Sequence, residues 1–359
     1  MSGGAVASQS EPSAELPSGG RRRDIEEGLL DGGLWFRVEA ATTAAAVRRT
    51  AERLATELGI ADKDIADLSI VVAEAAGNLV KHAEGGVMLV RAVRARTRAG
   101  VELIAIDSGP GMSDVLRAVG DGHSTAGTLG IGLGAILRQA SWSDMHSVPG
   151  KGTVLAAQVW PGGEPERSWA AGLTRPLTGE PVSGDSYAIR EAGGRHQVLV
   201  CDGLGHGRLA HAAAQEAVHA FHAAAAIPPA AVVEALHRAL SHTRGAALAV
   251  AELDVERSVL RYCGLGNISG TLLAGDGTRK GLVSLPGIAG HQKRQIREYD
   301  YPLDRDAVLL MHSDGLVDRW NPYDYPGLLM HSPQVIAATV LRDAGVRRDD
   351  ASVLVARVP

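Results

Sequence analysis

The sequence predicts two α+β domains in series, and three observations support this fold class. The 359-residue chain is long enough for two ordinary domains, and its 45% hydrophobic and 21% charged residues are typical of globular proteins. Helix-like and strand-like segments mix on both sides of a Gly/Pro-rich stretch, PGGEPERSWAAGLTRP. Four apolar runs in the second half have an acidic residue at one end. We expect a disordered tail at 1–33, a first domain at 34–160, a linker at 161–176 and a second domain at 177–359.

Hydrophobic periodicity predicts the individual elements. Apolar residues spaced three and four apart predict helices at 42–58 and 62–83, and strand-like runs follow at 87–95, 101–107 and 153–159. The second domain alternates short apolar runs with two Ala-rich helical segments. The expected strands are 186–190, 196–201, 246–253, 258–263, 307–312 and 352–358, and the expected helices are about 208–226 and 229–242.

Composition excludes several classes of protein. The net charge of -5, without a sustained basic stripe, argues against a nucleic-acid partner. No apolar stretch reaches the roughly 18 to 20 residues that span a bilayer, and the Ser/Gly/Pro-rich N-terminus lacks the apolar core of a secretory signal. Cys201 and Cys263 lie in apolar runs and are predicted to be buried free thiols. We expect a cytoplasmic protein with no membrane partner.

Two segments of the first domain carry polar residues in patterns suited to a ligand. Glu74 and Asn78 lie four apart on the helix at 62–83, and Lys81 extends their face by a turn. A solvated helix face would have the same pattern, so this cluster alone leaves both interpretations open. Next, VELIAIDSGPGM at 101–112 is a strand that delivers Asp107 into a glycine turn, where its carboxylate can accept a hydrogen bond from an exocyclic amine such as that of adenine.

A third segment is rich in glycine. DGHSTAGTLGIGLGAILRQA at 121–140 precedes and begins an apolar helix, and backbone N–H groups at such a helix start hold phosphates. A Rossmann fingerprint would need a strand before these glycines, and no GxxxxGK[ST] loop is present.

In this order, EAAGNLVKHA, DSGPGM and STAGTLGIGLG resemble the boxes of the GHKL (Bergerat) ATP-binding fold, most of all the RsbT/RsbW class of anti-sigma serine kinases. The resemblance implies an α/β sandwich that binds ATP with Mg²⁺. Asn78 would hold the Mg²⁺, Asp107 would read adenine and Glu74 would act as general base. The other implied nucleotide-binding residues are Lys81, Gly109, Gly111, Gly130, Gly132, Gly134 and Thr153. Such a pocket serves either a kinase or a nucleotide sensor.

The acidic residues of the second domain suggest a metal site. They are Asp185 in SGDSY, Asp202 in LVCDGLGHG, Asp314 in MHSDGL, and Asp349 with Asp350 in RRDDAS. Each alone is more often a turn residue than a ligand. Gathered together they would repel one another unless cations neutralised them, and all-oxygen ligands suit Mg²⁺ or Mn²⁺.

With GLGNISG at 264–270, these motifs resemble the metal-dependent protein phosphatase (PPM) family, in particular its SpoIIE branch. TRGAALAVAELD at 243–254 is similar to the RsbX-like subset. The resemblance implies a β-sandwich flanked by helices and two Mn²⁺ or Mg²⁺ ions, with Asp202 and Asp314 at the catalytic centre. The implied metal ligands are Asp185, Asp202, the Gly203 carbonyl, Asp314 and Asp349. Whether Asp350 reaches a metal stays open.

One departure from the phosphatase pattern affects the expected chemistry. Larger family members often have histidine directly after the Asp-Gly pair, where this chain has Leu204. We expect His206 to belong to the turn, so the proton for the leaving group would come from water.

Together the resemblances imply a regulator that dephosphorylates phosphoserine or phosphothreonine on a STAS-domain partner, in a partner-switching pathway that controls a sigma factor or stressosome. The resemblance also implies that the first domain could phosphorylate the same partner, which would make the chain a bifunctional switch. The alternative is a module that sequesters a partner in an ATP-dependent way with little turnover, against which Glu74 and the full acidic set argue. A stand-alone ATPase is disfavoured because no transducer segment or coiled coil joins the domains. A homodimer is compatible with both families, but the sequence does not require one.

Overall fold

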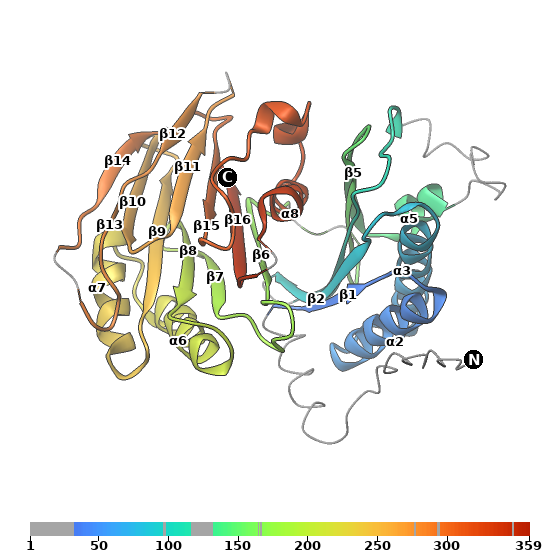
Figure 1. Cartoon of the computed structure of the whole chain (residues 1–359), viewed down its shortest axis with the longest axis horizontal. Helices are drawn as coiled ribbons and strands as arrows, with labels where there is room; N and C mark the ends of the chain where they lie inside the picture. Colours follow the sequence, from blue (N-terminus) through green and yellow to red (C-terminus); the bar gives the residue numbers. More distant parts are fainter. Residues whose placement is uncertain are drawn as a thin grey trace, which may run out of the picture.

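The computed structural model describes residues 32–95, 98–115, 132–163, 165, 167–275, 278–292, 295–346 and 348–359. Most of the predicted tail at 1–33, and the part of the glycine-rich segment that contains Gly130, lie outside the described residues. Figure 1 shows the elements stacked in layers, with three sheets and with helices on the outside and in the middle.

The N-terminal unit is a five-stranded antiparallel sheet with helices on one face. The strand order is β1-β2-β3-β5-β4. Apolar residues of the two long helices, such as Val47, Leu68 and Val72, pack on Leu103 and Leu155 of the sheet. The elements are β1 (Leu34–Arg37), α2 (Ala41–Glu57), α3 (Asp62–His82), β2 (Val87–Ala95), β3 (Arg98–Ile106), α5 (Gly132–Gln139), β4 (Trp142–Val148) and β5 (Gly152–Val159).

The C-terminal unit is a sandwich of two sheets. Strands β13-β10-β9-β8-β7, with β14 also paired to β10, form one sheet, and β12-β11-β15-β16-β6 form the other. Val198 and Leu260 of the first sheet pack against Leu309 and Leu354 of the second. The strands are β6 (Ala170–Arg175), β7 (Asp185–Ala192), β8 (Arg195–Gly203), β9 (Ala246–Asp254), β10 (Val259–Leu265), β11 (Ser269–Leu273), β12 (Arg279–Gly281), β13 (Ser284–Leu285), β14 (Tyr299–Pro302), β15 (Val308–His312) and β16 (Ala351–Arg357).

Helices cover both outer faces of this sandwich. Helices α6 (Arg208–Ala223) and α7 (Pro229–Ala239) pack on the first sheet, and α8 (Pro333–Ala344) packs on the second. The predicted α+β fold class is therefore confirmed. Helix α8 is absent from the sequence prediction because residues around its whole circumference are buried, so it lacks the polar stripe that marks an amphipathic helix.

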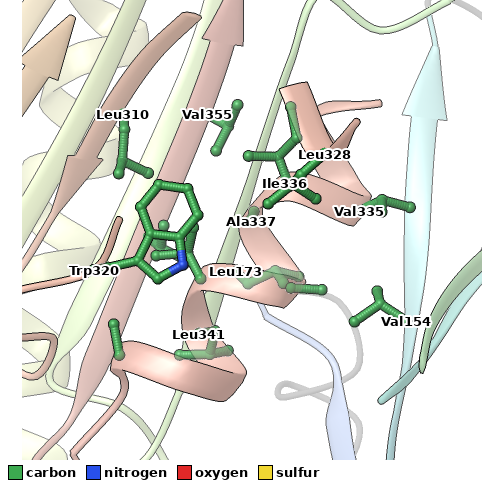
Figure 2. Close-up of a cluster of buried hydrophobic side chains, with 14 of the residues drawn as sticks. Val154, Leu173, Leu310, Trp320, Leu328, Val335, Ile336, Ala337, Leu341 and Val355 are labelled. Atoms are coloured by element: carbon green, nitrogen blue, oxygen red, sulfur yellow. The ribbon is translucent and has the colours of Figure 1, made fainter. Parts of the chain in front are cut away.

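The two units share one hydrophobic cluster, which is centred on α8. Figure 2 shows Val335, Ile336 and Leu341 of this helix, with Val154 of β5 on one side and Leu173 of β6 on the other. In Figure 1 the helix lies between the N-terminal sheet and the sandwich. The sheet face that α2 and α3 leave open is thus covered by the C-terminal unit.

Part of the segment expected to be a linker is a strand. Residues 170–175 form β6, which pairs antiparallel with β16 from Ala170↔Ala356 to Ala351↔Arg175. Gly172 allows a close approach here, because a Cβ on it would lie 2.5 Å from the Tyr187 ring. The Gly/Pro content of 161–176 concealed this strand, whose partner lies about half the chain away.

Two predictions about the whole chain can be compared with the structure. Cys201 and Cys263 are buried and free, as predicted. Among the helices that the structure describes, none is long and apolar enough to cross a membrane.

Asp144 on β4 links the two units through hydrogen bonds to the start of α8. Its carboxylate accepts bonds from His331 Nδ1 at 2.8 Å and from the Ser332 amide at 2.7 Å. Burial alone would raise the pKa of Asp144, but these bonds lower it to about 2. The ionised carboxylate therefore stabilises the fold at a pH above its ordinary pKa, and this contribution is lost as the pH falls towards 2.

We predict that Asp144→Asn lowers the free energy of unfolding by roughly 1–3 kcal/mol at pH 7. The difference between variant and wild type should shrink as the pH falls from about 4 to 2, because the wild-type carboxylate is then protonated. Urea unfolding of both proteins across this range measures it. A constant difference at every pH would contradict the assigned role of the charge.

Candidate functional site

The predicted nucleotide residues of α3 lie beside the start of α5. A Cβ placed on Gly132 would lie 2.9 Å from Glu74 Oε2 and 3.5 Å from Asn78 Oδ1. The helix start and the two polar side chains are therefore close neighbours, and a larger residue at position 132 would displace the Glu74 carboxylate. Two segments about 55 residues apart in sequence meet here, as the resemblance implies.

Asp107 forms a second part of this pocket, where β3 ends. Its Oδ1 accepts a hydrogen bond from the Gly109 amide at 2.8 Å, and its own amide donates to the Thr153 carbonyl at 2.9 Å. Burial raises the pKa of Asp107, and backbone hydrogen bonds to its carboxylate from Gly109 and Thr153 oppose that rise. A Cβ on Gly109 would lie 2.7 Å from the His82 carbonyl at the end of α3, so this glycine turn packs directly against that helix.

The remaining predicted nucleotide residues occupy varied positions. Gly111 has a φ of +66°, which favours glycine, and a Cβ there would lie 2.1 Å from the Val148 carbonyl. Gly134 is buried in α5, and Lys81 is exposed in the last turn of α3. Gly130 lies outside the described residues, so its position relative to the pocket stays a prediction.

Two of the acidic residues of the C-terminal unit are partners across neighbouring strands. Asp185 at the start of β7 pairs in register with Asp202 near the end of β8. Asp185 is 2% exposed and accepts a hydrogen bond from Ser313 Oγ. Gly203 follows Asp202, and a Cβ there would lie 2.2 Å from the Ala210 carbonyl of α6. The strand end thus has to be glycine for α6 to pack against it.

The other acidic residues come from the second sheet of the sandwich. Asp314 follows β15 and accepts a hydrogen bond from Asn267 Nδ2 at 2.7 Å. Asp349 lies just before β16, and its Oδ1 accepts a bond from the Asp350 amide at 2.9 Å. Because β15 and β16 are antiparallel, the end of one and the start of the next meet at the same end of the sandwich.

The charges of these carboxylates act on one another. Burial, followed by the charges of Asp314 and Asp349, raises the pKa of Asp202 to about 7. Burial and the charge of Asp202 raise the pKa of Asp185 well above its usual value. Burial and Asp314 also raise the pKa of Asp349. Acids that hinder one another's ionisation form a site that a divalent cation would stabilise, and their oxygen atoms suit a hard ion.

No three Asp, Glu, His or Cys side chains in the described part of the chain form a ready-made metal cage. The carboxylates share one neighbourhood, but three of them accept hydrogen bonds from polar neighbours, Asp185 from Ser313, Asp314 from Asn267 and Asp349 from the Asp350 amide.

The structure indicates a structural role for Asp350, which the sequence left open. Its Oδ1 accepts a bond from the Leu177 amide at 2.7 Å, and its Oδ2 accepts one from the Gly184 amide at 2.9 Å. Asp350 is 3% exposed. It therefore holds the backbone directly before Asp185, and both of its oxygens are already engaged.

Two histidines near this site have hydrogen-bond partners other than its carboxylates. His206 Nδ1 is 2.9 Å from Glu180 Oε1, which places it in the turn, as expected. His211 Nδ1 lies 2.9 Å from the Ser183 carbonyl. His211 is half-buried against the segment that carries Asp185.

Sequence reasoning missed three residues of this neighbourhood. Asn267 and Ser313 donate to Asp314 and Asp185, and their motifs, GLGNISG and HSDGL, were recognised only as markers of the family. The third is Arg244, an exposed residue whose Nη1 lies 3.2 Å from the place a Cβ on Gly205 would occupy. It stands beside the loop that follows Asp202, and nothing in its local sequence indicates this.

Comparison with known proteins identifies both units. The family model of the histidine kinase-like ATPase domain matches residues 36–158, and that of stage II sporulation protein E (SpoIIE) matches residues 192–359. The serine/threonine-protein kinase RsbT of Bacillus subtilis (strain 168) is 35% identical over 115 residues, which are 32% of this chain and 86% of RsbT. The chain belongs to the histidine kinase-like ATPase and SpoIIE phosphatase families, fused in one polypeptide.

Two further relatives match the phosphatase part of this fusion. The phosphoserine phosphatase RsbX of Bacillus subtilis (strain 168) is 23% identical over 141 residues, which are 38% of this chain and 69% of RsbX. A solved structure from work on the bacterial stressosome, a modular system adapted to control secondary messenger signalling, is 26% identical with a TM-score of 0.50. It covers 54% of this chain and 100% of its own. The fusion therefore combines a SpoIIE-type phosphatase with an RsbT-like kinase-like domain.

Proposed function

We propose that the phosphatase hydrolyses phosphoserine or phosphothreonine on a STAS-domain partner and that the ATP-binding domain phosphorylates the same partner. The supporting observation is the gathering of four mutually repelling carboxylates at one end of the sandwich, in a chain that also carries a nucleotide pocket. Residues 34–160 would form the kinase domain and 177–359 the phosphatase domain. The names of RsbT and RsbX, a kinase and a phosphatase of one organism, support a shared partner.

The metal ligands would be Asp185, Asp202, the Gly203 carbonyl, Asp314 and Asp349. Two Mn²⁺ or Mg²⁺ ions would supply an activated water and would neutralise charge on the phosphate. Around them, Ser313 and Asn267 orient two of the carboxylates through hydrogen bonds. Asp350 keeps the backbone before Asp185 in place. These neighbours would hold the ligands in position before the substrate binds.

In the ATP-binding domain, Asn78 would hold Mg²⁺ and Asp107 would read adenine. Lys81, Thr153 and the glycines 109, 111, 130, 132 and 134 would line the nucleotide. Glu74 would accept the proton of the attacking serine hydroxyl, and its carboxylate beside the start of α5 supports that role. The competing interpretation is a partner-sequestering module with little turnover, and the phosphatase relationship favours the enzyme.

Phosphate release from a phosphoserine STAS protein by the full chain in Mn²⁺ tests this proposal. We expect release that stops with EDTA and with Asp185→Asn. Asp300→Asn, an exposed aspartate on β14, is the matched control and should keep full activity. Bound metal without release from any phosphorylated STAS protein would favour the sequestering module.

Arg244 is expected to bind the phosphate of the substrate. Its exposed guanidinium lies beside the loop after Asp202, and a guanidinium forms paired hydrogen bonds to phosphate oxygens. We predict that Arg244→Ala lowers kcat/KM about 10- to 100-fold, which corresponds to the loss of one charged hydrogen-bonding group. Steady-state kinetics with the phosphoprotein measures this, and the equally exposed Arg305→Ala serves as control. Equal kcat/KM values for the two variants would contradict a role for Arg244 in binding the phosphate.

Glu74→Gln distinguishes a kinase from a nucleotide sensor. We predict that it lowers transfer of phosphate to the STAS protein about 10²- to 10⁴-fold, because a general base contributes a factor of that size. The affinity for ATP should change little, since glutamine preserves the shape of the side chain. Radiolabelled phosphate transfer and nucleotide titration measure the two effects. A wild-type protein that binds ATP but never phosphorylates the partner would identify a sensor.

A further inference from the structure

Helix α8 of the phosphatase contacts the nucleotide pocket at Asp107. The guanidinium of Arg342, near the end of this helix, donates from Nη1 to the Asp107 carbonyl oxygen at 3.1 Å. The Arg342 side chain is only 5% exposed, and its Nε and Nη2 bond to the Asp343 carboxylate at 2.9 and 2.8 Å. A buried cation is thus fixed on the backbone of the residue expected to read adenine.

The same end of α8 is joined to the loop that carries Asp314. The Val317 amide donates to the Ala344 carbonyl at 2.9 Å, and the Val346 amide donates to the Gly315 carbonyl at 2.7 Å. An isolated bridge pairs Leu316 with Gly345. The carboxylate loop is therefore hydrogen-bonded to residues that lie two to four positions after Arg342.

That loop is tightly packed on its other side. A Cβ on Gly315 would lie 1.8 Å from the Asp350 carbonyl, next to Asp349. A displacement at the end of α8 would therefore reach both Asp314 and Asp349. No long chain of contacts is needed, because only two to four residues separate the nucleotide contact at Arg342 from the residues bonded to the carboxylate loop.

The helix is well suited to transmit such a displacement. Buried residues line it on all sides, and both the N-terminal sheet and β6 pack against it, as Val154 and Leu173 do in Figure 2. Densely packed interiors deform little and move as units.

We propose that the ATP-binding domain is an effector site for the phosphatase, with an adenine nucleotide as the ligand and Arg342 on α8 as the positioning residue that couples the two sites. This inference rests on the proposed function. Nucleotide binding at Asp107 shifts its backbone carbonyl, Arg342 follows, and the Asp314 loop changes its position relative to Asp202. The chain thereby adjusts dephosphorylation to nucleotide binding, apart from any phosphate transfer by the first domain.

The experiment uses the full chain with a non-hydrolysable ATP analogue, which removes any kinase reaction from the assay. We expect the analogue to change kcat/KM for the phosphoprotein in Mn²⁺ by at least about 5-fold, the lower end of typical coupling between sites. Arg342→Met should reduce this change to less than about 2-fold while both sites still bind, and Arg342→Lys should restore part of it.

Arg357→Met is the matched control. Arg357 also donates two hydrogen bonds to carbonyls, those of His331 and Leu329 at 2.8 Å each, but all three residues belong to the phosphatase unit. In Arg357→Met the ATP analogue should change kcat/KM as much as it does in the wild type. An Arg342→Met protein that keeps the full nucleotide effect, or a wild type that binds the analogue without any change in kcat/KM, would overturn the proposal.

Amide hydrogen exchange gives a readout that does not depend on catalysis. We expect the analogue to change the exchange of the Val317 and Val346 amides in the wild type and not in Arg342→Met. If the chain hydrolyses no phosphoprotein even without nucleotide, the proposed function has failed. The exchange result then decides the coupling separately, because unchanged exchange at both amides would refute it.

Discussion

Asp202→Asn should lower phosphate release roughly 10²- to 10³-fold and yet make the metal-free protein more stable than the wild type. The loss of activity follows from the proposed role of Asp202 as a ligand, because the metal ions would stabilise transition-state charge by several kcal/mol. The gain in stability follows from the pKa of Asp202, which is raised to about 7 by burial and by Asp314 and Asp349. A charge that the folded state disfavours destabilises that state when it is ionised.

The stability gained by Asp202→Asn should depend on pH. A carboxyl group whose folded pKa lies above its unfolded value favours folding at low pH, and this stability is lost as the pH rises to about 7. In EDTA, the free energy of unfolding of Asp202→Asn should therefore exceed that of the wild type by about 1–3 kcal/mol at pH 8 and by less at pH 5. Urea unfolding measures both values. Added Mn²⁺ should reverse the order, because binding to the native site stabilises the wild type.

Asp350→Asn is the informative comparison. Both oxygens of Asp350 accept bonds from backbone amides, so an amide group in their place turns one acceptor into a donor that faces another donor. We expect lower stability with or without metal, the opposite of Asp202→Asn. Equal stabilisation by both substitutions would mean that Asp350 belongs to the repelling set.

Glu102→Ala should destabilise the protein by about 3–5 kcal/mol, the typical cost of breaking a buried ion pair. Glu102 is 1% exposed and accepts a 2.6 Å bond from Arg91 Nε and another from Gln158 Nε2 at 2.6 Å. Burial alone would lower the pKa of Arg91, and the charge of Glu102 makes the largest contribution that raises it. Without Glu102 a buried cation is left without its carboxylate.

This ion pair also connects the two units, so its loss should destabilise both. Arg91 Nη1 also donates to the Gly172 carbonyl at 2.7 Å and to Tyr187 Oη at 2.8 Å, and both of these lie in the C-terminal unit. Glu102→Ala should therefore lower the midpoint temperature at which the whole chain unfolds, as measured by thermal unfolding. The exposed Glu191→Ala should leave it unchanged. The double substitution Arg91→Met with Glu102→Leu should cost less than Glu102→Ala, because no unpaired charge stays buried.

Local sequence was sufficient to predict most elements of each unit and most of the proposed site residues. The helix at Asp62–His82 and the strand at Val87–Ala95 were predictable because their apolar residues recur with the periods of a helix and a strand. Asp107, Asp202 and Asp314 were noticeable because each lies at or just beyond the end of an apolar strand, at a place where a carboxylate becomes accessible. These signals lie within a few residues of one another in the chain.

Tertiary contacts decided the rest. Strand β6 pairs with β16, which lies about 180 residues later, and α8 is buried on all sides, so neither has a local pattern to read. Asp350 and Asp349 are adjacent acids in RRDDAS, yet only the packing of the loop at Gly184 separates a structural acid from a predicted ligand. The sequence alone therefore indicated the two families and the chemistry proposed for them, because motifs are local. The arrangement of the units around α8 came only from the structure, because it depends on contacts between residues far apart in the chain.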